Sequence, residues 1–175
     1  MKKELANKLK KIKLLILDVD GVLTNGQIVI DHNGNEIKIF NVRDGFGIVL
    51  LRQCGIKCAI ITARYSKAVD ARAKDLKIDK VYQDAKPKTI AYQKLLKLMK
   101  LKDEEACFMG DDLTDLSVLK RVGLSVSVPN GVGEVKRLVD YVTKNEGGNG
   151  AVREMVELIL KAQNKWKSII SAASQ

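Results

Sequence analysis

Runs of apolar residues alternate with amphipathic segments along most of the chain. Most of the short runs are apolar without polar alternation, as is typical of strands buried on both faces of a sheet. These runs lie at 14–18, 57–62, 80–82, 106–110, 124–128 and 141–143. Apolar residues at helical spacing predict helices at 3–11, 45–54, 66–76, 89–99, 115–122, 133–138 and 151–164. Alternating strands and helices predict an α/β fold, a Rossmann-like three-layer α/β/α sandwich with a parallel sheet.

The segment 27–42 departs from this pattern. Its two strand-like runs, 27–30 and 36–42, flank Asn33 and Gly34, and an Asn-Gly pair is a strong hairpin signal. A two-stranded hairpin is marginal in water by itself, so its isoleucines need a partner surface. That surface is either the rest of the domain or another subunit, and we favour another subunit.

Length and composition indicate one domain spanning 1–175, with 165–175 as a C-terminal tail. No apolar run reaches the length of a membrane span, so we expect no membrane association. The first 13 residues are basic but lack the apolar core of a signal peptide. The cysteines Cys54, Cys58 and Cys107 form no C-x-x-C motif and fit a reducing, cytoplasmic location.

The formal net charge is +10, from 31 Lys+Arg against 21 Asp+Glu. Aromatic residues do not interleave with the lysines as a nucleic-acid stacking surface requires, so we expect no nucleic-acid partner. The basic surface equally suits a small, highly anionic substrate. The sequence has one histidine, His32, so a zinc site that needs two histidines is excluded.

Polar side chains follow four of the predicted strands at the point where each ends. They are Asp18, Asp20, Thr62, Lys88, Asp111, Asp112 and Asp115. Because the carboxyl ends of parallel strands share one edge of a sheet, this edge would gather five carboxylates, a hydroxyl and an ammonium. Such carboxylates repel one another, and Mg²⁺ with oxygen ligands relieves that conflict. The set suits phosphoryl transfer, with a carboxylate as the attacking group.

These residues carry a resemblance. The strings DVDGVLT at 18–24, ITAR at 61–64, the lysine at 88 and GDDLTD at 110–115 are similar, in order, to the four motifs of the haloacid dehalogenase superfamily of phosphatases. The resemblance implies Mg²⁺-dependent ester hydrolysis through an aspartyl phosphate. It implies that Asp18 is the nucleophile and that Asp20 is the general acid, then the base.

The same resemblance implies the remaining roles. Asp18, Asp111 and the backbone carbonyl of Asp20 would bind the metal, supported by Asp112 and Asp115. The phosphate would be held by Thr62, Ala63 and Lys88. Lys86 competes for the lysine role because it directly precedes a proline.

A narrower resemblance covers about residues 10–165. The strings VRDGFGI, TAR, GDDLTDL, VGLSVSV and GGNGAVREM are similar to the family of 3-deoxy-D-manno-octulosonate 8-phosphate phosphatases, which serve lipopolysaccharide biosynthesis. This implies a capless enzyme with a small β-hairpin flap at 27–42. It also implies a phosphorylated sugar acid as substrate. The partners would be three further copies, in a homotetramer whose neighbouring subunit covers each active site.

Arg43, Arg64 and Lys67 are candidates for binding the substrate's carboxylate or phosphate. The structural alternative is ion pairing with Asp44 or Asp70. Another open question concerns Arg153. The glycines at 147, 148 and 150 either form a flexible loop that brings it to a neighbour's site or only mark the start of the last helix.

Three other functions compete. One is a phosphatase for the 9-phosphates of nine-carbon keto acids such as sialic acids, whose members tend to place a glutamate near the position of Arg64. A second is a signalling receiver domain, but there the phosphorylated aspartate ends the third strand, and here that strand leads to Lys88. A third is a non-catalytic binding domain of the same fold, which the intact Asp18, Asp20 and Asp111 argue against.

Overall fold

A six-stranded parallel sheet forms the centre of the molecule in the computed structural model, which describes residues 3–173. The strands are β1 (Leu14–Leu17), β4 (Lys57–Ile61), β5 (Lys80–Tyr82), β6 (Ala106–Met109), β7 (Leu124–Ser127) and β8 (Tyr141–Val142). Their order is β5-β4-β1-β6-β7-β8, and every neighbouring pair runs parallel. Each strand begins at the predicted residue, so the predicted parallel sheet is confirmed.

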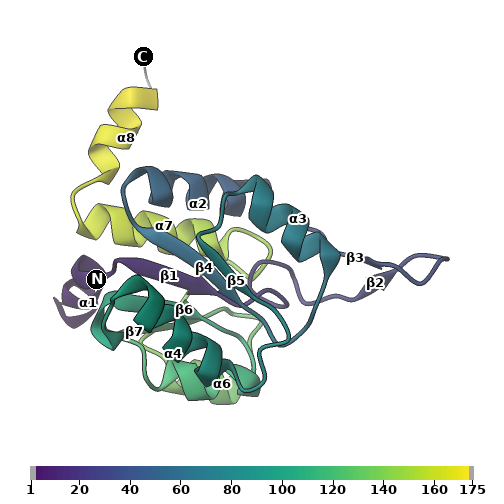
Figure 1. The fold of residues 1–175 in the computed structure, drawn as a ribbon. Coiled ribbons are helices and arrows are strands. Elements are labelled where there is room, and N and C mark those ends of the chain that lie inside the picture. Colours follow the sequence, from purple (N-terminus) through teal and green to yellow (C-terminus); the bar gives the residue numbers. More distant parts are fainter. Residues whose placement is uncertain (1–2, 174–175) are drawn as a thin grey trace.

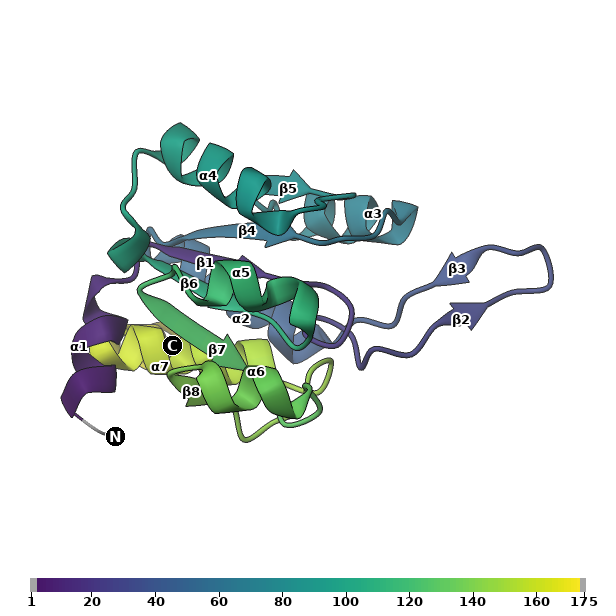
Figure 2. The same cartoon turned by 90° about the horizontal axis from the view of Figure 1, so that it is seen from below.

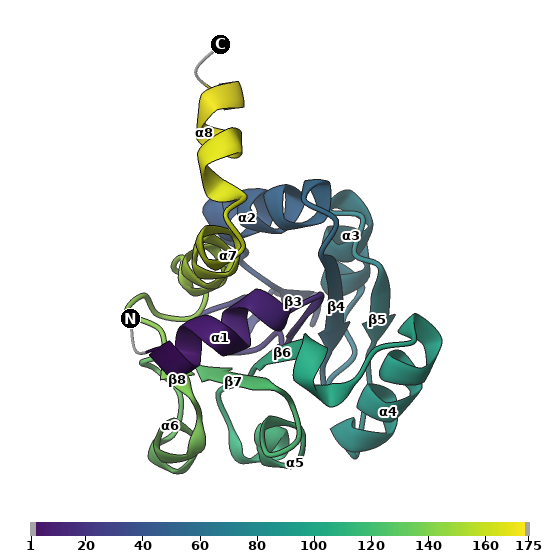
Figure 3. The same cartoon turned by 90° about the vertical axis from the view of Figure 1, so that its left-hand side faces the viewer.

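Helices cover both faces of the sheet (Figures 1 and 3). One layer holds α1 (Lys3–Lys11), α2 (Val42–Gln53), α3 (Lys67–Asp75) and α7 (Ala151–Ala162), and the other holds α4 (Lys88–Met99), α5 (Leu116–Leu119) and α6 (Gly133–Leu138). Because side chains alternate along a strand, Leu15 of β1 packs into the first layer and Ile16 into the second. The three-layer α/β/α architecture is confirmed.

Some helix boundaries differ from the prediction. The helix α2 begins at Val42, three residues early, because the Asn41 side chain accepts a hydrogen bond from the Arg43 N–H and caps it. The helix predicted at 115–122 is instead a 3₁₀ turn, η2 (Leu113–Asp115), followed by the single turn α5. A second 3₁₀ turn, η1 (Asp103–Glu105), precedes β6.

The C-terminal segment forms a helix, α8 (Trp166–Ala173), where the sequence predicts only a tail. Figure 1 shows α8 extending away from the body of the molecule. Its first turn is anchored, because Trp166 and Ile169 pack against the core and the Arg153 guanidinium lies 5.3 Å from the Trp166 ring. The anchor explains why so short an apolar pattern forms a helix.

The hairpin stands out from the carboxyl edge of the sheet (Figure 2). Its strands, β2 (Val29–Ile30) and β3 (Glu36–Ile37), are each two residues long, so the longer runs predicted at 27–30 and 36–42 are wrong in extent. The Asp31 carboxylate closes the turn by accepting hydrogen bonds from the N–H groups of Asn33 and Asn35. Five apolar side chains of the hairpin stay exposed: Ile28, Val29, Ile30, Ile37 and Ile39.

No helix within residues 3–173 combines the length and the apolar character that crossing a membrane requires.

Candidate active site

The predicted polar residues meet in a cavity of about 340 Å³ at the carboxyl edge of the sheet. Asp18 follows β1, Thr62 follows β4, and Asp111 comes two residues after the end of β6. Ligands of open parallel sheets bind at this edge, so the fold explains the position of the cavity. The lining residues are Asp18, Asp20, Gly26, Thr62, Ala63, Arg64, Lys86, Lys88, Asp111, Asp112 and Thr114.

A buried ion-pair cluster lies at the base of the cavity. The Lys88 side chain is 2% exposed, and its Nζ lies 2.7 Å from Asp18 Oδ2 and 2.5 Å from Asp115 Oδ1. These two carboxylates raise the Lys88 pKa even though burial, the largest single influence, lowers it. Lys86 lies at the exposed rim of the same cavity. Of the two lysines, the geometry therefore favours Lys88 for holding a group bound beside Asp18.

The carboxylates are crowded enough to fit a divalent cation. One oxygen from each of Asp18, Asp111 and Asp115 lies within 4.8 Å of the others. Burial raises the pKa of Asp18 to about 6, reinforced by the charge of Asp115 and opposed by Lys88. Burial, followed by the charges of Asp18 and Asp115, raises the pKa of Asp111 to about 7. A bound cation would stabilise the charged form of both buried carboxylates and offset their mutual repulsion, and Mg²⁺ prefers such oxygen ligands.

Within this cluster, both carboxylate oxygens of Asp115 already have hydrogen-bond partners in the protein. Its side chain is fully buried, with Oδ1 bound to Lys88 and Oδ2 accepting the N–H groups of Asp111 (3.0 Å) and Asp112 (3.2 Å). Asp112 is exposed and caps η2 by accepting the Leu113 N–H. Asp115 thus fixes the loop that carries Asp111. Asp18 keeps one partner on each oxygen, Val19 N–H on Oδ1 and Lys88 on Oδ2, and the Asp111 carboxylate accepts no hydrogen bond from the described residues, so these two carboxylates are the ones that can face a cation.

Glycines allow the loop after Asp18 to pack tightly. A Cβ at Gly21 would lie 2.0 Å from the Asp111 carboxylate, and one at Gly147 would lie 1.7 Å from the Gly21 carbonyl oxygen. Asn130 bridges the same two glycines, donating to the Gly21 carbonyl at 3.0 Å and accepting the Gly147 N–H at 2.8 Å. The glycine-rich segment therefore packs against the loop that follows Asp18 in its own chain.

The Asp20 side chain points away from the carboxylate cluster and toward the hairpin. Its Oδ1 accepts a hydrogen bond from Lys38 Nζ, and its Oδ2 lies 3.7 Å from Arg64 Nε. Arg64 also pairs with Glu36 at 2.7 Å. Arg64 is thus placed at the cavity, without the ion pair to Asp44 or Asp70 that was its structural alternative.

Three other predicted residues lie outside the cavity. Arg43 is exposed and lines a separate hollow with Arg153, and Lys67 is exposed at the start of α3. Arg153 pairs with Glu157 at 2.9 Å and lies over the rings of Phe46 and Trp166. In the single chain, none of these three reaches the site, and their substrate contacts stay predictions.

Sequence reasoning missed Glu36, Lys38 and Asn130. A signal for the first two was present, because the string Glu36-Ile37-Lys38-Ile39 alternates and places both charged residues on one side of a strand. No comparable signal marks Asn130, whose two partners are 109 and 17 residues away in sequence.

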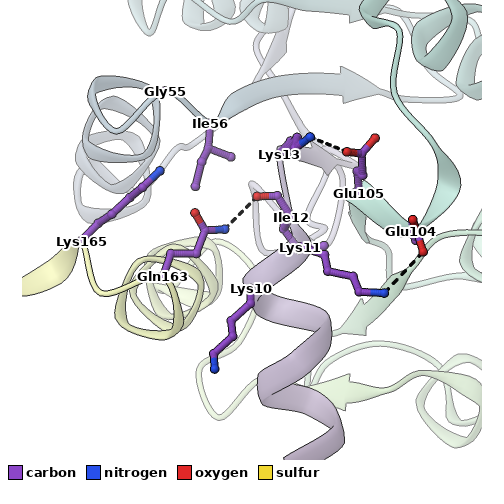
Figure 4. A pocket seen from close by; sticks show the side chains of 10 residues that line it. All are labelled: Lys10, Lys11, Ile12, Lys13, Gly55, Ile56, Glu104, Glu105, Gln163 and Lys165. Carbon is purple, nitrogen blue, oxygen red and sulfur yellow. Dashed lines mark hydrogen bonds and ion pairs between the residues drawn. The ribbon is translucent and has the colours of Figure 1, made fainter.

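A larger cavity, of about 570 Å³, lies at the opposite, amino end of the sheet (Figure 4). Most of its polar lining is already paired. Lys11 pairs with Glu104, Lys13 with Glu105, and Lys165 donates to the Cys54 carbonyl. Its position and its paired charges set it apart from the site described above.

Comparison with known proteins agrees with this geometry. Residues 61–155 match the model of the haloacid dehalogenase-like hydrolases. The chain is 46% identical over 158 residues to the 3-deoxy-D-manno-octulosonate 8-phosphate phosphatase KdsC of Escherichia coli strain K12, covering 90% of this chain and 84% of the relative.

Solved structures are equally similar. The 3-deoxy-D-manno-octulosonate 8-phosphate phosphatase of Moraxella catarrhalis, in complex with magnesium ion, phosphate ion and KDO, is 44% identical with a TM-score of 0.96, covering 98% of this chain and 99% of that one. The enzyme of the same name from Yersinia pestis is 42% identical with a TM-score of 0.94, covering 95% and 90%.

Proposed function

The chain belongs to the haloacid dehalogenase-like hydrolases, and we propose that it acts through an aspartyl phosphate on Asp18. It is a Mg²⁺-dependent phosphatase of 3-deoxy-D-manno-octulosonate 8-phosphate. The observation that carries the proposal is the buried Lys88–Asp18 pair beside the Asp111 carboxylate, at the carboxyl edge of the sheet. It joins a nucleophile, a phosphate-binding cation and a metal ligand in one cavity. The free sugar acid would enter lipopolysaccharide biosynthesis.

In the first step, an Asp18 oxygen attacks phosphorus and the bond from phosphorus to the sugar oxygen breaks. Asp20 gives a proton to the departing oxygen. Lys88 and the Thr62 hydroxyl bind the phosphoryl oxygens, and Thr62 is buried at the end of β4 beside Ala63. Mg²⁺, held by Asp18, Asp111 and the Asp20 carbonyl, would offset the negative charge that the nucleophile and phosphate share.

In the second step, Asp20 takes a proton from water, which attacks phosphorus and releases phosphate from Asp18. Asp20 suits both steps because its side chain is 26% exposed at the mouth of the cavity, while that of Asp18 is 8% exposed. Among the three basic candidates, we assign the substrate carboxylate to Arg64. It lines the cavity and its guanidinium can bind a carboxylate through two hydrogen bonds.

We also propose a homotetramer in which hairpins pack together and a neighbour covers the active site. The support is the set of exposed apolar hairpin side chains, led by Ile30 at 64% and Ile39 at 68%. Exposed apolar patches of this kind mark interaction surfaces. The three free cysteines support a cytoplasmic location.

The test is phosphate release with Mg²⁺ and with EDTA. The panel holds 3-deoxy-D-manno-octulosonate 8-phosphate, a sialic acid 9-phosphate, a hexose 6-phosphate and a 3′-phosphorylated oligonucleotide. We expect Mg²⁺-dependent preference for the first. Preference for the 9-phosphate would overturn the substrate and keep the mechanism, and release from none would overturn both.

A further inference from the structure

The hairpin carries a buried lysine that contacts the general acid. We propose that Lys38 is a positioning residue, whose ammonium holds Asp20 by Oδ1 in the orientation in which Oδ2, when protonated, gives its proton to the leaving alcohol. The inference rests on the proposed role of Asp20 and goes beyond it, because it gives the hairpin a part in the chemistry of its own subunit.

The burial of Lys38 is the first observation. The Lys38 side chain is 3% exposed, whereas the whole residues on either side of it, Ile37 and Ile39, are 46% and 68% exposed. A lysine ammonium leaves water only where it gains partners, and here they are Asp20 Oδ1 and, at 3.3 Å, Glu36 Oε1. Glu36, in β3, and Lys38, just after it, thus pair with each other and reach Arg64 and Asp20, whereas Ile37 and Ile39 stay exposed.

The second observation is how few groups fix Asp20. Within residues 3–173, its carboxylate contacts Lys38 and, more distantly, Arg64 Nε at 3.7 Å. The Arg64 side chain is 48% exposed and makes its shorter contact with Glu36, so it restrains the orientation of the Asp20 side chain only weakly. Lys38 is therefore the group that selects the side-chain orientation of Asp20.

A proton donor must lie within hydrogen-bond reach of the atom it protonates, so loss of this restraint should slow only the reaction that needs the proton. Arginine at the same position would keep the positive charge and could also reach Asp20, so it should preserve the restraint. The outward isoleucines and the inward lysine share one short segment. Packing on the outer face of the hairpin would thus also fix the orientation of Asp20.

The test compares p-nitrobenzyl phosphate with p-nitrophenyl phosphate, which differ by one methylene and carry no carboxylate. The benzylic alcohol needs a proton to leave, whereas p-nitrophenolate does not. The readout is kcat/KM, which covers the steps up to departure of the alcohol. We expect Lys38→Met to lower kcat/KM about 10-fold or more for the benzyl ester and less than about 3-fold for the phenyl ester.

Three further variants make the result interpretable. Lys38→Arg should recover most of the benzyl ester activity, and Lys97→Met, at an exposed site on α4, should match the wild type with both esters. An equal loss with both esters, or no loss, would overturn the positioning role. Asp20→Asn separates the two proposals. If it too affects both esters equally, the acid role of Asp20 is wrong. If it discriminates and Lys38→Met does not, only the inference about Lys38 is wrong.

Discussion

Replacing Asp111 by asparagine should stabilise the metal-free protein at alkaline pH. The change keeps the size of the side chain and removes one charge from a cluster that holds Asp18 and Asp115 within 4.8 Å. The Asp111 carboxylate accepts no hydrogen bond from any residue that the structure describes, so little is lost with the charge. In the absence of metal, burial and the neighbouring carboxylates disfavour the Asp111 charge more than Lys88 favours it.

The magnitude follows from the pKa of Asp111, which is raised from 3.8 to about 7. Each pKa unit corresponds to about 1.4 kcal/mol, and the partial exposure of the side chain reduces the full figure to roughly 2 kcal/mol. Between about pH 4 and pH 7, the folded wild type binds more protons than the unfolded chain, so its stability falls as pH rises through that window. Asp111→Asn has no carboxyl group at this position, so its stability does not fall for this reason as pH rises.

The assay is thermal unfolding in EDTA at pH 5 and pH 8, repeated with Mg²⁺. At pH 8 in EDTA, the variant should melt about 6 °C above the wild type, from roughly 3 °C per kcal/mol for a chain of this size. At pH 5 the difference should shrink toward zero. With Mg²⁺ the order should reverse, because only the wild type gains the free energy of metal binding. A variant that is less stable than the wild type at pH 8 in EDTA would refute the reasoning.

Three further predictions concern packing and assembly. Lys88→Met leaves the carboxylates of Asp18 and Asp115 buried without their cation, so it should lower the free energy of unfolding in urea by about 3–5 kcal/mol and abolish activity. The control Lys86→Met, at the rim, should change that free energy by less than about 0.5 kcal/mol. Gly147→Ala places a Cβ 1.7 Å from the Gly21 carbonyl oxygen and should cost about 2 kcal/mol or more, with a matching loss of activity. Ile30→Asp should lower the mass in light scattering while leaving Lys38 in place, and an unchanged mass would refute the hairpin interface.

The parallel sheet and the alternation of strands and helices along the chain could be predicted because the inner strands β1, β6 and β7 are buried along their whole length. A run such as 14–17 has no polar position, so it fits only the centre of a covered sheet. Residues that directly follow those strands, such as Asp18 and Thr62, then take their place from the fold alone. The shortened helix after Asp115 could not be predicted, because capping by Asp112 and the ion pair to Lys88 determine the local turn.

Contacts between segments that are far apart in the chain also could not be predicted from the sequence. Asn130 touches Gly21 and Gly147 only because three loops meet at the carboxyl edge. Arg153 lies over the Trp166 ring because the first turn of α8 packs against the core. Lys38 reaches Asp20 because the hairpin turns at Gly34, where φ is +80°. Each depends on the relative position of elements that are far apart in sequence, which local pattern does not specify.

The most direct test of the account is to trap the phosphorylated enzyme. Protein mixed with substrate and Mg²⁺ is quenched in acid within the first turnover and treated with borohydride, which reduces an acyl phosphate to the alcohol. Peptide mass spectrometry should then find homoserine in place of aspartate at position 18, and the signal should vanish in Asp18→Asn. Homoserine at another aspartate, or active turnover by Asp18→Asn, would contradict the claim that Asp18 is the nucleophile.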